Sequence, residues 1–199
     1  MYHLVHTATY QMVHCSTMGR DELLKRVVAE GERNGLTGRS LRDLGSAVGT
    51  SHRMLIHHFG SQAELVAAIV ESIAADEHRI VTAVTQDDPV EAVAALWERT
   101  SAPENHPHLR LLFSSYGRAI EGADPFTRLL PGLVEDWVDA ANSSNVRDGE
   151  CDETAIRARV GLAVVRGLLL DLMTTHDDLA TQRAFDYFIS LMRTDPTES

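Results

Sequence analysis

The sequence predicts an all-α fold, and three observations point to it. Apolar residues recur at intervals of three and four along most of the chain, as in Leu23, Leu24, Val27 and Val28, which is the spacing of an amphipathic helix. Clusters of Gly, Pro, Asp and Ser interrupt this pattern and mark the ends of helices. No stretch alternates between apolar and polar residues over several positions, so no sheet is expected.

The first helix is expected to start at Arg20 and to end at Gly35, a C-cap glycine. Ser40 and Ser61 are candidate N-caps, and Glu64 follows Ser61 by three residues, which is the capping-box spacing. Helices are therefore predicted over residues 20–34, 41–48, 51–59, 62–84, 89–100, 106–121, 126–143, 152–175 and 179–193.

Composition indicates a folded cytoplasmic protein of one or two domains. The chain has 199 residues, of which 44% are hydrophobic and 24% charged, and no apolar run approaches the roughly 18 residues that span a bilayer. Cys15 and Cys151 are too few and too far apart to indicate a disulfide framework, so reduced thiols are expected. Residues 1–17 contain no Lys or Arg and no helical period. We expect a disordered extension there, with Met18 as a candidate native start.

The charge is unevenly distributed along the chain. The net charge is −11, yet residues 18–66 carry seven Lys or Arg against six Asp or Glu, a net of +1. Residues 67–199 therefore carry −12, because the first 17 residues are uncharged. A near-neutral head on an acidic body suits a protein whose head alone approaches phosphates.

Residues 40–59 have the pattern of a helix-turn-helix. Two helices that cross steeply need a small residue at their contact, which Gly45 supplies, and a residue tolerant of positive φ at the turn, which Gly49 supplies. Leu44, Val48 and Leu55 form the expected inner face. The alternative is a pair of surface helices joined by a glycine turn.

The run from Val48 to Leu65 resembles the signature of the tetracycline-repressor (TetR) family of bacterial transcriptional regulators. The matching residues are Gly49, Ser51, Leu55, His57, Phe59, Ser61 and Leu65. The resemblance implies a three-helix DNA-binding head over residues 18–65 and a ligand-binding and dimerisation domain over residues 66–195. It also implies a homodimer that binds double-stranded operator DNA, usually as a repressor, and that responds to a small-molecule effector.

Three residues depart from the family pattern. Ile56 stands where a phosphate-contacting tyrosine is usual, Gln62 where a lysine is common, and Met54 where a small or hydroxyl residue is common. Each departure removes a polar contact to DNA.

Candidate DNA contacts lie at the helix starts of the head. The first residues of a recognition helix point at base edges, and the starts of the flanking helices hold phosphates. The candidates are Arg39, Ser40, Arg42, Thr50, Ser51, His52, Arg53, His57, Ser61 and Gln62. His58, beside Phe59, is at least as well explained as a packing residue.

The body offers candidates for a pocket and for a dimer face. The residues expected to line an apolar pocket are Trp97, Phe113, Tyr116, Phe126, Leu130 and Trp137, although such residues are more often plain core. The last two predicted helices are apolar on more than one face, which suggests a bundle between two copies. The interface candidates are Val164, Leu168, Phe185 and Phe188. Arg166 and Asp171 interrupt an otherwise apolar helix, and a position at its edge is slightly favoured over a buried one.

Neither metal nor catalytic chemistry is indicated. The ten histidines show no zinc-site spacing, and no phosphate-binding glycine loop or nucleophile elbow occurs. No cofactor and no enzymatic activity are expected. Two hypotheses remain: a ligand-responsive repressor, and a helical ligand- or protein-binding module whose head has weak or no DNA affinity.

Overall fold

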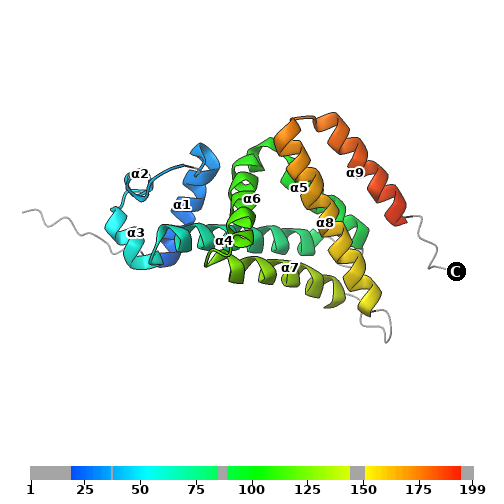
Figure 1. Ribbon diagram of the computed structural model, residues 1–199, viewed down its shortest axis with the longest axis horizontal. Helices are drawn as coiled ribbons and strands as arrows, with labels where there is room; N and C mark the ends of the chain where they lie inside the picture. Colours follow the sequence, from blue (N-terminus) through cyan, green and yellow to red (C-terminus); the bar gives the residue numbers. More distant parts are fainter. Residues whose placement is uncertain (1–18, 37, 85–88, 144–150, 194–199) are drawn as a thin grey trace, which may run out of the picture.

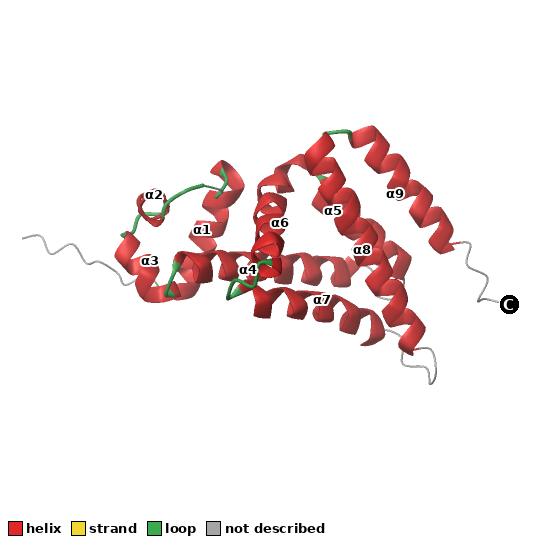
Figure 2. Ribbon diagram, viewed as in Figure 1, coloured by secondary structure: helices red, strands yellow, loops and turns green. Residues whose placement is uncertain are grey.

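The computed structural model describes residues 19–36, 38–84, 89–143 and 151–193. This part of the chain consists of helices and short loops, without a strand (Figure 2), and confirms the all-α prediction. In chain order the elements are α1 (Arg20–Asn34), α2 (Leu41–Ala47), α3 (His52–Phe59), α4 (Gln62–Val84), α5 (Pro89–Ser101), the 3-10 helix η1 (Pro103–Asn105), α6 (His106–Ile120), α7 (Phe126–Ser143), α8 (Cys151–Thr175) and α9 (Asp178–Arg193). The extension predicted over residues 1–17 and the candidate start at Met18 lie outside the described residues.

The helices divide into a small head and a larger body (Figure 1). Helices α1, α2 and α3 gather at one end of the molecule, and α8 and α9 lie at the other. Helix α4 begins in the head and contacts α1 and α3 there, then runs into the body, where it contacts α5, α6 and α7. One continuous helix therefore links the head to the body.

The helix boundaries agree closely with the sequence pattern, and the differences have local causes. Ser51 is the N-cap of α3 rather than its first residue, because its side chain accepts a hydrogen bond from the Met54 amide. The predicted break at Pro103 contains the short helix η1. Pro107 sits in the first turn of α6, where a helix does not need the missing N–H.

Two hydrophobic clusters form the core. The first combines the head with the adjoining parts of α4, α6 and α7 and includes Leu23, Leu55, Leu65, Leu111 and Phe126. The second lies among α5, α6, α8 and α9. The first cluster crosses residue 65, where the sequence placed a domain boundary, so the head shares its core with the start of the body.

Phe126 is expected to contribute strongly to the stability of this shared core. Its side chain is 0% exposed, and Arg118 lies over its ring at 4.3 Å. Phe126→Ala should lower the free energy of unfolding by about 3–5 kcal/mol, the usual cost of truncating a buried phenylalanine. The measurement is chemical denaturation followed by circular dichroism. Ile120→Ala, at an apolar residue that is 86% exposed, is the control and should change stability little.

Candidate DNA-binding face and ligand cavity

The turn between α2 and α3 has the close approach that the glycine pattern predicts. A Cβ atom on Gly45 would lie 3.0 Å from the backbone nitrogen of His52 and 3.1 Å from the carbonyl oxygen of Thr50. Gly49 has a φ of +76°, a conformation that side-chain-bearing residues rarely adopt. Both glycines are thus required by the backbone path of the turn.

The inner face of this helix pair is closed by apolar side chains. Leu44, Val48, Leu55 and Phe59 are all buried, with Leu55 only 1% exposed. His58 is partly buried beside them, and its Nε2 atom has no hydrogen-bond partner. His58 is therefore a packing residue of the head.

The opposite face of α3 is open. His52, Arg53, Ile56 and His57 are exposed, and their spacing of one, three and four residues places them on one side of the helix. Among the described residues Arg53 has no ion-pair partner, so its guanidinium donors are available. Ile56 is 39% exposed and adds an apolar surface to this face.

Serine side chains fix the starts of three helices of the head. The hydroxyls of Ser40, Ser51 and Ser61 each accept a hydrogen bond from the backbone amide three residues on, at 3.1 to 3.2 Å. The hydroxyl of Ser40 also donates to the Asp43 carboxylate at 2.6 Å, and this contact lowers the pKa of Asp43. The backbone amide of Thr50 donates to the carbonyl of Gly45 at 2.8 Å. The three serines and Thr50 thus fix the starts of α2, α3 and α4 and the turn between α2 and α3.

Arg39 and Gln62 are also engaged within the head. Arg39 Nη1 donates to Oε1 of Glu30 at 2.7 Å, and Gln62 Nε2 donates to the carbonyl oxygen of Arg39 at 3.1 Å. Glu30 is 5% exposed, and the hydrogen bond from Arg39 lowers its pKa. The sequence marks Arg39 and Gln62 as phosphate contacts, and this role stays a prediction. In the structure they tie the loop before α2 to α1 and α4. Arg42 is exposed.

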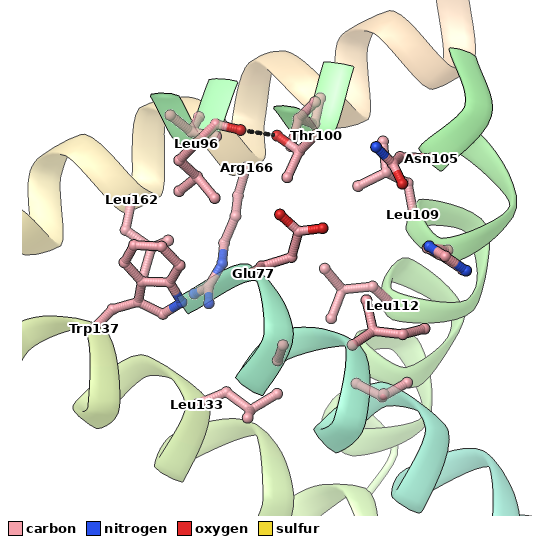
Figure 3. Close-up of a pocket in the computed structure, with 16 residues that line it drawn as sticks. Glu77, Leu96, Thr100, Asn105, Leu109, Leu112, Leu133, Trp137, Leu162 and Arg166 are labelled. Atoms are coloured by element: carbon pink, nitrogen blue, oxygen red, sulfur yellow. Dashed lines mark hydrogen bonds between the residues drawn. The ribbon is translucent and has the colours of Figure 1, made fainter. Parts of the chain in front are cut away.

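The body contains a partly open cavity of about 90 Å³ (Figure 3). This is several times the ~10–15 Å³ that one water molecule needs. Its walls are mostly apolar and come from α4, α5, α6, α7 and α8, with Leu96, Leu133 and Leu162 among them. Glu77 and Arg166 are its two charged residues.

Of the six predicted pocket residues, Trp137 lines this cavity. Phe126 and Leu130 belong to the shared core with the head. Trp97 is stacked on Phe185 with 4.7 Å between ring centroids, and its Nε1 donates to Gln182 at 2.8 Å. Phe113 and Tyr116 pack beside one another on α6 and are outside the lining. The predicted set is thus largely core, because large apolar residues at helical spacing fill packed interfaces first.

Arg166 is the lining residue whose placement differs from the sequence interpretation. A position at the helix edge was favoured for both Arg166 and Asp171. Asp171 is exposed, which fits that interpretation, but Arg166 enters the cavity. The signal was present in the sequence as a single cation among apolar residues of α8.

Solved structures similar to this chain are known, although no protein-family model and no curated protein matches the sequence. A transcriptional regulator from Rhodococcus sp. Rha1 superimposes with a TM-score of 0.67 at 20% identity, over 86% of this chain and 94% of that one. A TetR transcriptional regulator from Legionella pneumophila gives a TM-score of 0.63 at 15% identity, over 84% and 95% of the two chains. NalD of Pseudomonas aeruginosa, the secondary repressor of the MexAB-OprM multidrug efflux pump, gives 0.56 at 15% identity, over 87% and 93%.

The chain has the TetR-family fold. Within this fold α2 and α3 have the close approach at Gly45, the positive-φ turn at Gly49 and the buried Leu55 that the sequence predicts. Within the described residues, no helix is long and apolar enough to cross a membrane, and no group of three metal-ligating side chains comes together.

The end of the TetR-family fold formed by α8 and α9 carries apolar residues on its outer surface. On α8 the exposed residues Ile156, Val160, Ala163, Gly167 and Leu170 follow one another at alternating spacings of four and three. On α9 the same spacing relates Ala180, Ala184, Tyr187 and Leu191. Such a repeat forms a continuous stripe along a helix.

The predicted interface residues lie partly on this face. Val164, Leu168 and Phe188 are partly buried, and Phe188 lines a shallow surface groove with Ile156 and Val160. Phe185 is different, because it is buried in the monomer against Trp97. Helix α9 therefore has apolar residues on two faces, and Phe185 is on the face that packs inside the monomer.

The Glu30–Arg39 ion pair is expected to contribute to stability in a pH-dependent way. Glu30→Gln should lower the free energy of unfolding at pH 7, because the charged hydrogen bond from Arg39 is lost. A carboxylate with a lowered folded-state pKa stabilises above its ordinary pKa of 4.5, and this contribution disappears as the pH falls through the lowered value. The difference between the two proteins should shrink over the same range. Equal stability of the two proteins at pH 7 would contradict this role, and Glu32→Gln on the exposed side of α1 is the control.

Proposed function

We propose that the protein is a DNA-binding transcriptional regulator: a homodimeric repressor that a small molecule bound in the body releases from operator DNA. The observation that carries this proposal is the contrast between the two faces of α3. One face is buried against the head, and the other presents His52, Arg53, Ile56 and His57 to solvent. A recognition helix needs such a face, because its first turns enter the major groove.

Each residue of the open face suits a different contact. Arg53 has free donors that suit the two acceptors of a guanine, and His52 can donate to a base or a phosphate. Ile56 suits the methyl group of a thymine, which is read by apolar contact. Arg42 and His57, both exposed, would contact phosphates, and such contacts position a DNA-binding head on the duplex.

A second copy of the chain would cover the α8–α9 face. The stripes on α8 and α9 have the spacing of helices that pack lengthwise, and two copies related by a two-fold axis would bring four helices together. A dimer also presents two heads, and two recognition helices must lie about 34–36 Å apart, or a multiple, to enter successive major grooves. Dimerisation and DNA affinity are therefore coupled in this proposal.

Helix α4 supports the proposed link between ligand and DNA. Its first turns pack in the head, and its later residues Val70, Ile73, Ala74 and Glu77 line the cavity. A ligand that displaces the cavity end of α4 would also change the separation of the two heads. By linkage, DNA would weaken ligand binding by the same factor as the ligand weakens DNA binding.

The alternative is a binding module whose head has weak or no DNA affinity. Ile56 favours it, because an exposed isoleucine replaces a polar phosphate contact, and so does Gln62, whose amide is engaged by Arg39. A gel-shift assay with the DNA upstream of the protein's own gene separates the two functions. A specific shifted band supports the regulator, and no band at low salt and micromolar protein supports the module.

Arg53→Ala tests the role of α3. It should lower operator affinity by about 1–3 kcal/mol and relax discrimination at one base position, while thermal unfolding stays unchanged because Arg53 is exposed. The readout is fluorescence anisotropy with labelled operator. Leu55→Ala should instead destabilise the fold by about 2–5 kcal/mol, and Arg110→Ala, at an exposed arginine of α6, is the control. If Arg53→Ala binds like wild type, α3 does not read bases through this residue.

Tyr187→Glu tests the dimer. Tyr187 is 66% exposed on the α9 stripe, so a carboxylate there should leave the monomer folded but place an unpaired charge in the interface. Light scattering should show a dimer for wild type and a monomer for the variant at micromolar concentration. DNA affinity should fall with it. Ile120→Glu, at an exposed apolar residue outside α8 and α9, should remain dimeric, and a dimeric Tyr187→Glu would refute this interface.

A further inference from the structure

Three of the polar residues that line the cavity, Glu77, Thr100 and Asn105, are engaged in hydrogen bonds. Glu77 accepts a hydrogen bond from Arg99 Nε at 2.5 Å, Thr100 donates to the carbonyl of Leu96 at 2.6 Å, and Asn105 donates to the carbonyl of Arg99 at 2.7 Å. The negative charge of Glu77 is therefore balanced by Arg99. The remaining polar lining residues are Arg166 and His108.

The positive charge of Arg166, in contrast, is not paired with a carboxylate of the described residues. Its side chain descends from α8 into the cavity, while Glu77 points in from α4 (Figure 3). Within the described ranges no carboxylate forms an ion pair with Arg166, and its one interaction is with the face of the Tyr116 ring, 5.3 Å from the guanidinium carbon. Burial lowers the pKa of Arg166, but an arginine stays protonated in proteins. The cavity thus contains one uncompensated positive charge.

Two buried atoms of α6 also lack partners, one on His108 in the cavity lining and one on Tyr116, whose ring contacts Arg166. His108 Nε2 and the Tyr116 hydroxyl are both buried without a hydrogen bond. Burial lowers the pKa of His108 and raises that of Tyr116, so the neutral form of each is favoured. Buried polar atoms are normally paired, and a guanidinium with an apolar surround is costly unless an anion meets it. Arg166 and His108, the polar lining residues without a partner, are therefore suited to bind a negatively charged oxygen.

We propose that this cavity binds an apolar monocarboxylate, with its carboxylate on Arg166 and its hydrocarbon part against the leucines of α5, α7 and α8. A carboxylate matches the planar donor fork of a guanidinium. A single negative charge neutralises the site, whereas a phosphate dianion would leave excess charge beside Glu77. The hydrocarbon part follows from the walls, where Leu96, Leu133 and Leu162 offer no hydrogen bond.

The proposal builds on the proposed function, because it assigns a chemical class to the effector of that regulator. Its test is nevertheless independent of DNA. Octanoate, 1-octanol and octylamine have the same chain and differ in the charge of the head group. Isothermal titration calorimetry of the full-length protein without DNA should show binding of octanoate, with 1-octanol about tenfold weaker or more and octylamine weakest. Trp137 in the lining gives a second readout by fluorescence.

Arg166→Met tests whether the charge of Arg166 causes the preference for octanoate over 1-octanol. The variant should bind octanoate about tenfold to a hundredfold more weakly, the range expected for one charge-assisted hydrogen bond, and should bind 1-octanol as well as wild type or better. Arg166→Lys should retain a preference for octanoate over 1-octanol and serves as a second variant if Arg166→Met fails to fold by circular dichroism. Arg110→Met, at an exposed arginine of α6, is the matched control and should bind octanoate like wild type.

Three results would overturn the proposal. They are equal binding of octanoate and 1-octanol by wild type, undiminished octanoate binding by Arg166→Met, and no binding of hexanoate, octanoate or decanoate at millimolar concentration. A gel shift repeated with octanoate separates this site from the regulator function. Arg166-dependent binding with unchanged operator affinity keeps the carboxylate site and rejects its role as effector site. Absence of any DNA binding rejects the regulator and leaves the site in place.

Discussion

The burial of α4 between Leu65 and Val70 is the constraint on which the rest of the structure depends. Leu65 and the four consecutive residues from Ala67 to Val70 are all buried, so this stretch must be covered from several sides at once. The head covers one side, and α6 and α7 cover others. The head can therefore not be a freely hinged module, because its core and that of the neighbouring body are the same hydrophobic cluster.

The head was predictable because its requirements are local in the sequence. A steep turn between two short helices needs a small residue, a residue with positive φ and an inward apolar residue at fixed spacings, and Gly45, Gly49 and Leu55 meet them. The helix starts were predictable for the same reason, since Ser40 and Ser61 act as caps through amides three residues away. Local geometry leaves few alternatives for such residues.

The contents of the body were less predictable. Helical spacing says that Phe126 and Trp97 face inward, but whether they meet packed neighbours or a void depends on helices distant in sequence. Both lie in packed core. The same limit applies to Arg39 in the loop before α2, whose partner Glu30 is nine residues earlier on α1. The charge at Arg166 was visible, but only the arrangement of α4, α5 and α7 around it distinguishes a buried cation from one at the helix edge.

The links made by Arg39 have a mechanical consequence. Glu30 on α1 holds the Arg39 side chain, and Gln62 at the start of α4 holds its carbonyl oxygen, so three segments of the head are braced at one residue. At Gly45 the backbone of α2 is in direct contact with the turn before α3, so these two segments are also held together. Because α3 follows this turn directly, a rotation of α3 alone would have to disturb the contact at Gly45. A displacement that reaches the head along α4 would therefore move α1, α2 and α3 together, as one rigid body.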